Sequence, residues 1–289
     1  MRAVFDSANM AGVKIIAQVP LTFDVASGGT THAPLAYVSV GGLPPVRYVV
    51  DTGSDVHLLT EDLADDLDLD KQPGEEGVDH SGATMPSWSV GSVAALVGDA
   101  ALELHNVVVI PAPPPFLGFG IRGVLSPQHL HPSAMAVIDT ASNELVLLDA
   151  TDDEVSNFLH DRLPGMAVHK LARDPDSAAV VVRGGIEGYA DVRALLDTGG
   201  KKTEFAAGAV PGLVGGEMQR LGGGVSGASY EGVFVGPQTL VIGGARLSVP
   251  DLALRQQMHD TEAIVSMDVL RGTVIAAAAD LDRPVFFAL

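Results

Sequence analysis

The chain has 289 residues, of which 47% are hydrophobic and 18% are charged, a composition that argues against disorder. Its 17 lysines and arginines against 36 aspartates and glutamates give a formal net charge of −19. Such an acidic chain would repel phosphate backbones, so we expect no binding to nucleic acid. The sequence contains no cysteine, which excludes disulfide scaffolds, zinc–thiolate sites, iron–sulfur clusters and a cysteine nucleophile.

Neither a signal peptide nor a membrane span is evident. Asp6 and Asn9 interrupt any apolar region near the N-terminus, and no run of about 18 apolar residues follows. We therefore expect a soluble protein without membrane contact, cytoplasmic by default. A mature form cut from a secreted precursor would have the same features.

Short apolar runs separated by glycine and proline predict a mostly β protein. The first is Val13–Val19, and the others are Ala36–Val40, Arg47–Val50, Val107–Ile110, Ala134–Ile138, Leu145–Leu148, Ala179–Val182, Thr239–Ile242, Thr273–Ala277 and Val285–Phe287. Only two helices are expected. They are Thr60–Leu69, with Thr60 as the candidate N-cap, and Asp152–Leu163.

An internal repeat organises the chain. Residues 50–53, 81–84 and 124–126 match residues 196–199, 226–229 and 264–266, in the same order and at nearly constant spacing. Three matches in register are hard to explain by chance, so they indicate a duplication. The predicted units are an N-terminal lobe over residues 1–150 and a C-terminal lobe over residues 151–289.

Each repeat contains one Asp-Thr-Gly directly after an apolar strand. The first copy is Asp51-Thr52-Gly53, followed by Ser54, and the second is Asp197-Thr198-Gly199, followed by Gly200. A single copy could be an ordinary turn, because Asp and Gly favour turns. Two copies at matching positions of a repeat indicate a shared chemical role instead.

With these motifs the sequence resembles the aspartic peptidases, from about Ala33 to Leu289. The later blocks Gly123–Ser126 and Ile264–Arg271 are similar to the apolar–apolar–Gly blocks of that family, with Ser126 and Ser266 in place of the glycine. The resemblance implies an all-β, bilobed, pepsin-like acid protease fold. It would consist of two retropepsin-like halves with a cleft between the lobes.

The resemblance also implies the catalytic groups. Asp51 and Asp197 would hold a water between them, one acting as base and the other as acid in the hydrolysis of a peptide bond. Two carboxyls held that close cannot both ionise freely, so they share a proton. No metal and no organic cofactor is implied. The expected partner is a peptide or protein substrate, and the expected state is a monomer.

The residues beside the two aspartates have expected supporting roles. Thr52 and Thr198 would hydrogen-bond across to the opposite loop. Gly53 and Gly199 permit a tight turn and a close approach of the backbone to the carboxylates. Ser54 could donate to the outer oxygen of Asp51, whereas Gly200 has no hydroxyl to do the same for Asp197.

A flap hairpin over the substrate is the remaining expectation. The candidate includes Ser81, Gly82 and Ala83 and runs from His80 to Trp88. Its repeat ends at Tyr230. Trp88 or Tyr230 could serve as the aromatic lid, and either could equally belong to the core.

Other motifs carry less weight. Gly118–Gly123 spells a dinucleotide fingerprint, but Pro127 prevents the helix that must follow. Asp66–Asp70 imitates a calcium loop without its required glycine and glutamate. His129 and His131 could face one side of a strand, although no carboxylate cluster accompanies them.

Two alternatives remain open beside the endopeptidase. A catalytically silent peptide-binding or scaffold protein of the same fold is favoured by Gly200 and by the atypical flap. A self-processing enzyme would use residues 1–31 as a removable segment. The acidic composition suits an acidic pH optimum, while cleavage specificity and the physiological substrate are not encoded in any pattern.

Overall fold

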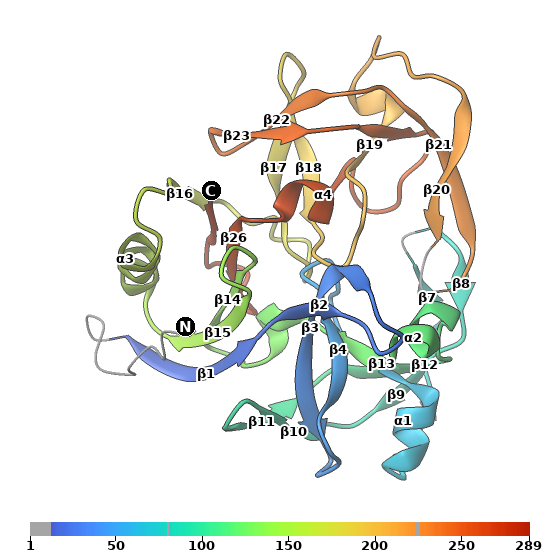
Figure 1. Ribbon diagram of the computed structural model, residues 1–289, viewed down its shortest axis with the longest axis vertical. Coiled ribbons are helices and arrows are strands. Elements are labelled where there is room, and N and C mark those ends of the chain that lie inside the picture. The colour runs from blue at the N-terminus through green and yellow to red at the C-terminus, as the bar shows by residue number, and fades with distance from the viewer. Residues whose placement is uncertain (1–12, 80, 224–225) are drawn as a thin grey trace.

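The computed structural model describes residues 13–79, 81–223 and 226–289. The expectation of an all-β fold is confirmed, since strands in several sheets make up most of the regular structure. Figure 1 shows one sheet in the lower half of the molecule, a second in the upper half and a third beside both. We call them the N-terminal, C-terminal and shared sheets.

The N-terminal sheet has ten strands among the described residues. They are β2 (Thr22–Asp24), β3 (Thr30–Val40), β4 (Val46–Val50), β5 (His57–Thr60), β6 (Gln72–Pro73), β9 (Trp88–Val90), β10 (Val93–Val97), β11 (Ala100–Leu104), β12 (Val107–Ile110) and β13 (Ile121–Leu125). A separate two-stranded hairpin of β7 (Gly77–Val78) and β8 (Thr84–Met85) extends from this half.

The C-terminal sheet has nine described strands. They are β17 (Val181–Ile186), β18 (Val192–Leu196), β19 (Glu204–Ala206), β20 (Met218–Gly223), β21 (Ser229–Phe234), β22 (Gln238–Ile242), β23 (Ala245–Val249), β24 (Ala253–Arg255) and β25 (Ala263–Val265). The hairpin of β20 and β21 runs down the right side of Figure 1 toward β7 and β8.

The two sheets pair their strands in the same way. β4 lies parallel to β13 as β18 does to β25, and β5 lies parallel to β12 as β19 does to β24. The hairpins β10–β11 and β22–β23 pair with β3 and β17 respectively. Equivalent pairing places the ends of β4 and β18 at equivalent points of their sheets.

The shared sheet takes strands from both halves of the chain. They are β1 (Lys14–Pro20), β14 (Met135–Asp139), β15 (Glu144–Asp149), β16 (Val168–Leu171), β26 (Val274–Ala278) and β27 (Val285–Ala288). At its centre β14 pairs with β26, so that Val137 lies opposite Ala276. This pairing joins the two halves through main-chain hydrogen bonds as well as apolar packing.

Four α-helices lie among the described residues: α1 (Glu61–Asp66), α2 (Pro114–Phe119), α3 (Asp152–Arg162) and α4 (Met267–Leu270). The prediction of α3 is confirmed, and Thr151 with Glu154 forms a capping box at its start. Its buried face, including Phe158, packs against the shared sheet at Met135 and Phe286. No helix in the described ranges is long and apolar enough to span a bilayer.

The helix predicted over Thr60–Leu69 is shorter than expected, and its capping was predicted wrongly. Thr60 holds the N-cap position, but its hydroxyl donates to the carbonyl of Arg122, 3.1 Å away. The Thr60 hydroxyl is therefore hydrogen-bonded to strand β13 and does not cap the helix as the sequence pattern had predicted.

Candidate functional site

The two Asp-Thr-Gly loops begin where β4 and β18 end. The N–H of Asp51 donates to the carbonyl of Leu125 on β13, and the N–H of Asp197 donates to Val265 on β25, both at 2.9 Å. Each aspartate is thereby fixed to the strand that lies parallel to its own. One loop extends from the N-terminal sheet and the other from the C-terminal sheet, and the threonines that follow the two aspartates are in contact. The loops therefore meet between the two sheets.

Thr52 and Thr198 exchange hydrogen bonds between the loops. The N–H of Thr52 donates to Oγ1 of Thr198 at 3.0 Å, and the N–H of Thr198 donates to Oγ1 of Thr52 at 3.2 Å. The hydroxyls in turn donate to the carbonyls of Leu196 and Val50, each on the opposite strand. Both threonines are fully buried, so these bonds form in a low-dielectric environment that strengthens them.

The glycines of each loop lie against the aspartate of the other loop. A Cβ placed on Gly199 would come within 2.4 Å of Oδ2 of Asp51, and one on Gly53 would come within 3.0 Å of Cγ of Asp197. The N–H groups of Gly53 and Gly199 both donate to Oδ1 of Asp51, at 2.7 and 3.3 Å. Asp51 and Asp197 therefore face each other across the two loops.

The two carboxyl groups have unequal environments. Asp197 is only 8% exposed. Burial, the charge of Asp51 and a hydrogen bond with Asp51 together raise the pKa of Asp197 well above its usual range, although backbone N–H groups of Gly200 and Gly199 oppose the shift. The pair titrates as a unit. The raised pKa of Asp197 means that the pair retains a proton above the usual pH range of a carboxyl group.

Ser54 does not have the role expected for it. Its hydroxyl donates to the carbonyl of Val56 at 2.7 Å rather than to the carboxylate of Asp51. The chain turns toward β5 immediately after Ser54, which brings the Val56 carbonyl within reach of the hydroxyl. At the equivalent position, Gly200 donates its N–H to Oδ1 of Asp197 at 2.7 Å.

The sequence analysis missed two equivalent residues, His57 and Thr203, each of which lies six positions after a loop aspartate. Nδ1 of His57 accepts the N–H of Ser126 at 3.2 Å, and Oγ1 of Thr203 accepts the N–H of Ser266 at 3.1 Å. Thr203 also donates to the Asp268 carboxylate. Each side chain thus joins the segment after its Asp-Thr-Gly loop to the residue that follows the neighbouring strand, β13 or β25. Their matching position in the repeat was the available signal.

The hairpins predicted as flaps meet each other. Oδ1 of Asp79 accepts the N–H of Ser81 at 2.8 Å, and its Oδ2 accepts the N–H of Ser226 from the β20–β21 hairpin, also at 2.8 Å. Hydrogen bonds from Ser226 and Ser81 outweigh burial, the largest single effect, and lower the pKa of Asp79. Gly82 takes a φ of 83° in this turn, and Ala83 closes it.

Of the two possibilities left open for Trp88, the structure shows the core and not the flap, and His80 lies outside the described residues. Trp88 belongs to β9 and packs against the core of the N-terminal sheet, with the Lys71 ammonium 5.8 Å from its ring centre. It therefore lies outside the β7–β8 hairpin.

Tyr230 does lie on the β20–β21 hairpin, but its hydroxyl is directed inward. It donates to Oε1 of the buried Glu204 at 2.8 Å, and the Arg255 guanidinium lies 4.2 Å from its ring centre. Glu204 and Arg255 also form an ion pair at 3.3 Å. The phenol thus anchors the hairpin to the C-terminal sheet.

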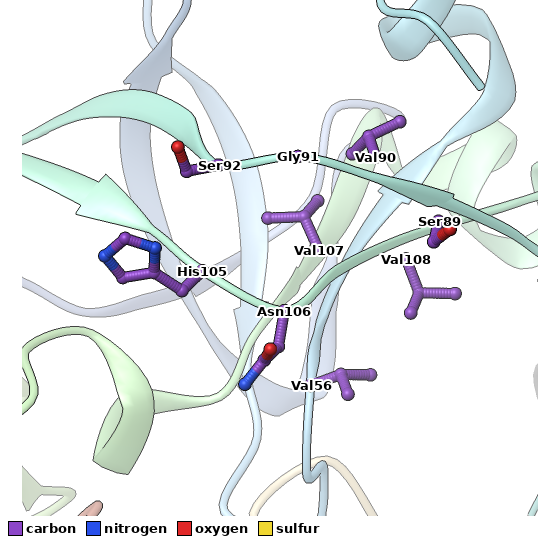
Figure 2. Close-up of a pocket in the computed structure, with 9 residues that line it drawn as sticks. All are labelled: Val56, Ser89, Val90, Gly91, Ser92, His105, Asn106, Val107 and Val108. Carbon is purple, nitrogen blue, oxygen red and sulfur yellow. The ribbon is translucent and has the colours of Figure 1, made fainter. Parts of the chain in front are cut away.

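A hollow of about 520 Å³ lies elsewhere, between β9, β12 and the residues before β5. Figure 2 shows its lining, with His105 at the left, Val90 and Ser89 at the right, and Asn106 beside Val56 at the lower edge. It contains neither aspartate, so it is separate from the site. Among the described residues no three His, Asp or Glu side chains form a group that could hold a metal.

Comparison with known proteins points to one family. Residues 36–127 match the family model described as aspartyl protease. The matched segment contains Asp51 and the β7–β8 hairpin and ends just beyond Ser126. No curated protein matches the sequence. The match supports a protease of the aspartyl class.

The glycine contacts predict an unequal response to the same substitution. Gly199→Ala would drive a Cβ into the Asp51 carboxyl, whereas Gly53→Ala requires its neighbours to move only a few tenths of an ångström. We expect Gly199→Ala to lower the free energy of unfolding by roughly 1–3 kcal/mol more than Gly53→Ala. Urea unfolding of both variants measures the difference. Equal losses would contradict this close approach.

The buried His57 predicts a loss of stability in acid. Burial lowers its pKa from 6.5 to about 4, although a hydrogen bond to His129 opposes the shift. As the pH falls from 6.5 to about 4, the unfolded chain takes up a proton that the folded chain does not. The free energy of unfolding should fall by about 3 kcal/mol through this group.

Urea unfolding of wild type and His57→Thr at several pH values tests this effect. Thr is the residue at the equivalent position 203. The variant should show a shallower decline between pH 6.5 and 4, while His160→Asn at an exposed histidine should decline as wild type does. Parallel curves for wild type and His57→Thr would contradict the effect.

Proposed function

We propose that this protein is an aspartic endopeptidase in which Asp51 and Asp197 activate a water molecule. The observation that carries the proposal is the pair of facing carboxyls, in which the pKa of Asp197 is raised, on loops held together by Thr52 and Thr198. The family match over residues 36–127 supports it independently. Binding alone would not require two like charges to be buried together.

The unequal environments suggest a role for each carboxyl. Asp51, charged, would take a proton from the water as its oxygen attacks the peptide carbonyl carbon. Asp197, protonated, would give its proton to the carbonyl oxygen, producing a tetrahedral diol. The proton on Asp51 would then pass to the amide nitrogen. The C–N bond breaks, and a diol hydroxyl returns its proton to Asp197 as the acid product forms.

We propose two lobes, over residues 1–150 and 151–289, that arose by duplication, because the two sheets pair their strands identically. An extended peptide would lie between them. The hairpins that meet at Asp79 and Ser226 would grip it as added strands. Opening this contact would admit the substrate.

A silent peptide-binding protein of the same fold is the second candidate. Gly200 and the inward-directed Tyr230 favour it, because neither supplies the group expected from the resemblance. Activity is what distinguishes the two candidates.

We expect wild type to cleave a mixed peptide library between about pH 3 and 8. Asp51→Asn and Asp197→Asn should each lower kcat by roughly 100- to 10,000-fold, because each removes one proton-transfer group. Asp139→Asn is the matched control, since Asp139 is a buried aspartate followed by threonine but lies on β14. It should retain activity while folded. Folded wild type without cleavage at any pH would favour the silent binding protein.

A further inference from the structure

The buried hydroxyl of Ser266, next to the Asp197-Thr198-Gly199 loop, has no role in the site as described so far. Ser266 directly follows β25 and is fully buried. Its Oγ has no hydrogen-bond partner among the residues that the structure describes. Buried polar groups of this kind are rare and require a physical explanation.

The position of this hydroxyl supplies one. A Cβ placed on Gly200 would lie 2.4 Å from Oγ of Ser266 and 2.5 Å from Oδ2 of Asp197. The hydroxyl and the carboxyl oxygen therefore both lie against Gly200, close to the same point. Any side chain on residue 200 would clash with both oxygens, so this arrangement depends on glycine there.

The equivalent hydroxyl in the first loop has a different environment. Oγ of Ser126 donates to the carbonyl of Ser54 at 2.6 Å, so its hydrogen-bonding capacity is used. Ser54 occupies the position equivalent to Gly200, and its side chain is present. The unpartnered hydroxyl is thus a property of the second loop alone.

We propose that Ser266 is a positioning residue whose hydroxyl donates to Oδ2 of Asp197 once that carboxyl has given up its proton. The inference rests on the proposed function, which makes Asp197 the acid. A buried carboxylate that forms during the reaction is stabilised by a donor already in place, and this stabilisation is absent from the resting state.

The first test is the pH dependence of Ser266→Ala. Removing an unpartnered buried hydroxyl should leave the fold intact. We expect kcat to fall about tenfold with KM unchanged, which is the effect of losing one hydrogen bond to a charged group. The basic limb of the kcat profile should move up by about one pH unit, because the ionised form of Asp197 loses its donor.

A second measurement needs no activity. The ¹³C resonance of the Asp197 carboxyl, titrated by NMR, should have a higher midpoint in Ser266→Ala than in wild type. Ser126→Ala removes the same hydroxyl where its partner is a neutral carbonyl, so its Asp197 midpoint should equal that of wild type. If wild type cleaves no peptide, the proposed function fails while this titration still tests the hydroxyl. An unchanged midpoint in Ser266→Ala would overturn the inference.

Discussion

The exchange of hydrogen bonds between Thr52 and Thr198 is the constraint on which the site depends. Two carboxyls of like charge repel, and burial adds to the free-energy cost of holding them together. The threonine bonds fix the loops, and the β14–β26 pairing at the centre of the shared sheet fixes the halves behind them. Gly53 and Gly199 then allow the carboxyls to approach, because a Cβ on Gly199 would overlap the Asp51 carboxyl and one on Gly53 would be in tight contact with both carboxyls.

The site has opposing responses to pH. The raised pKa of Asp197 means that folding takes up a proton, so the carboxyl pair favours the folded state as the pH falls. The lowered pKa of His57 has the opposite sign and favours the unfolded state below pH 6.5. The composition suggests an acidic pH optimum. At such a pH the rest of the fold would have to offset the free energy of unfolding that is lost through His57.

The sequence predicts backbone placement better than side-chain direction. The strands before Asp51 and Asp197 follow from apolar runs, and the paired Asp-Thr-Gly motifs indicate where two loops must meet. The sequence pattern predicted partners for Ser54 and Thr60, but other carbonyls accept hydrogen bonds from their hydroxyls: that of Val56 in the same loop and that of Arg122 on β13. The sequence left Trp88 open between lid and core, because its pattern does not show that the β7–β8 hairpin ends at Met85.

The central claim is that Asp51 and Asp197 share a proton in the folded protein, and the most direct test is the pH dependence of stability in wild type and Asp51→Asn. With the charge of Asp51 removed, Asp197 loses one of the causes that raise its pKa. The account predicts that Asp51→Asn is more stable than wild type at pH 7 and that this advantage shrinks toward pH 4. An offset that stays constant with pH would show that the two carboxyls titrate independently and would contradict the account.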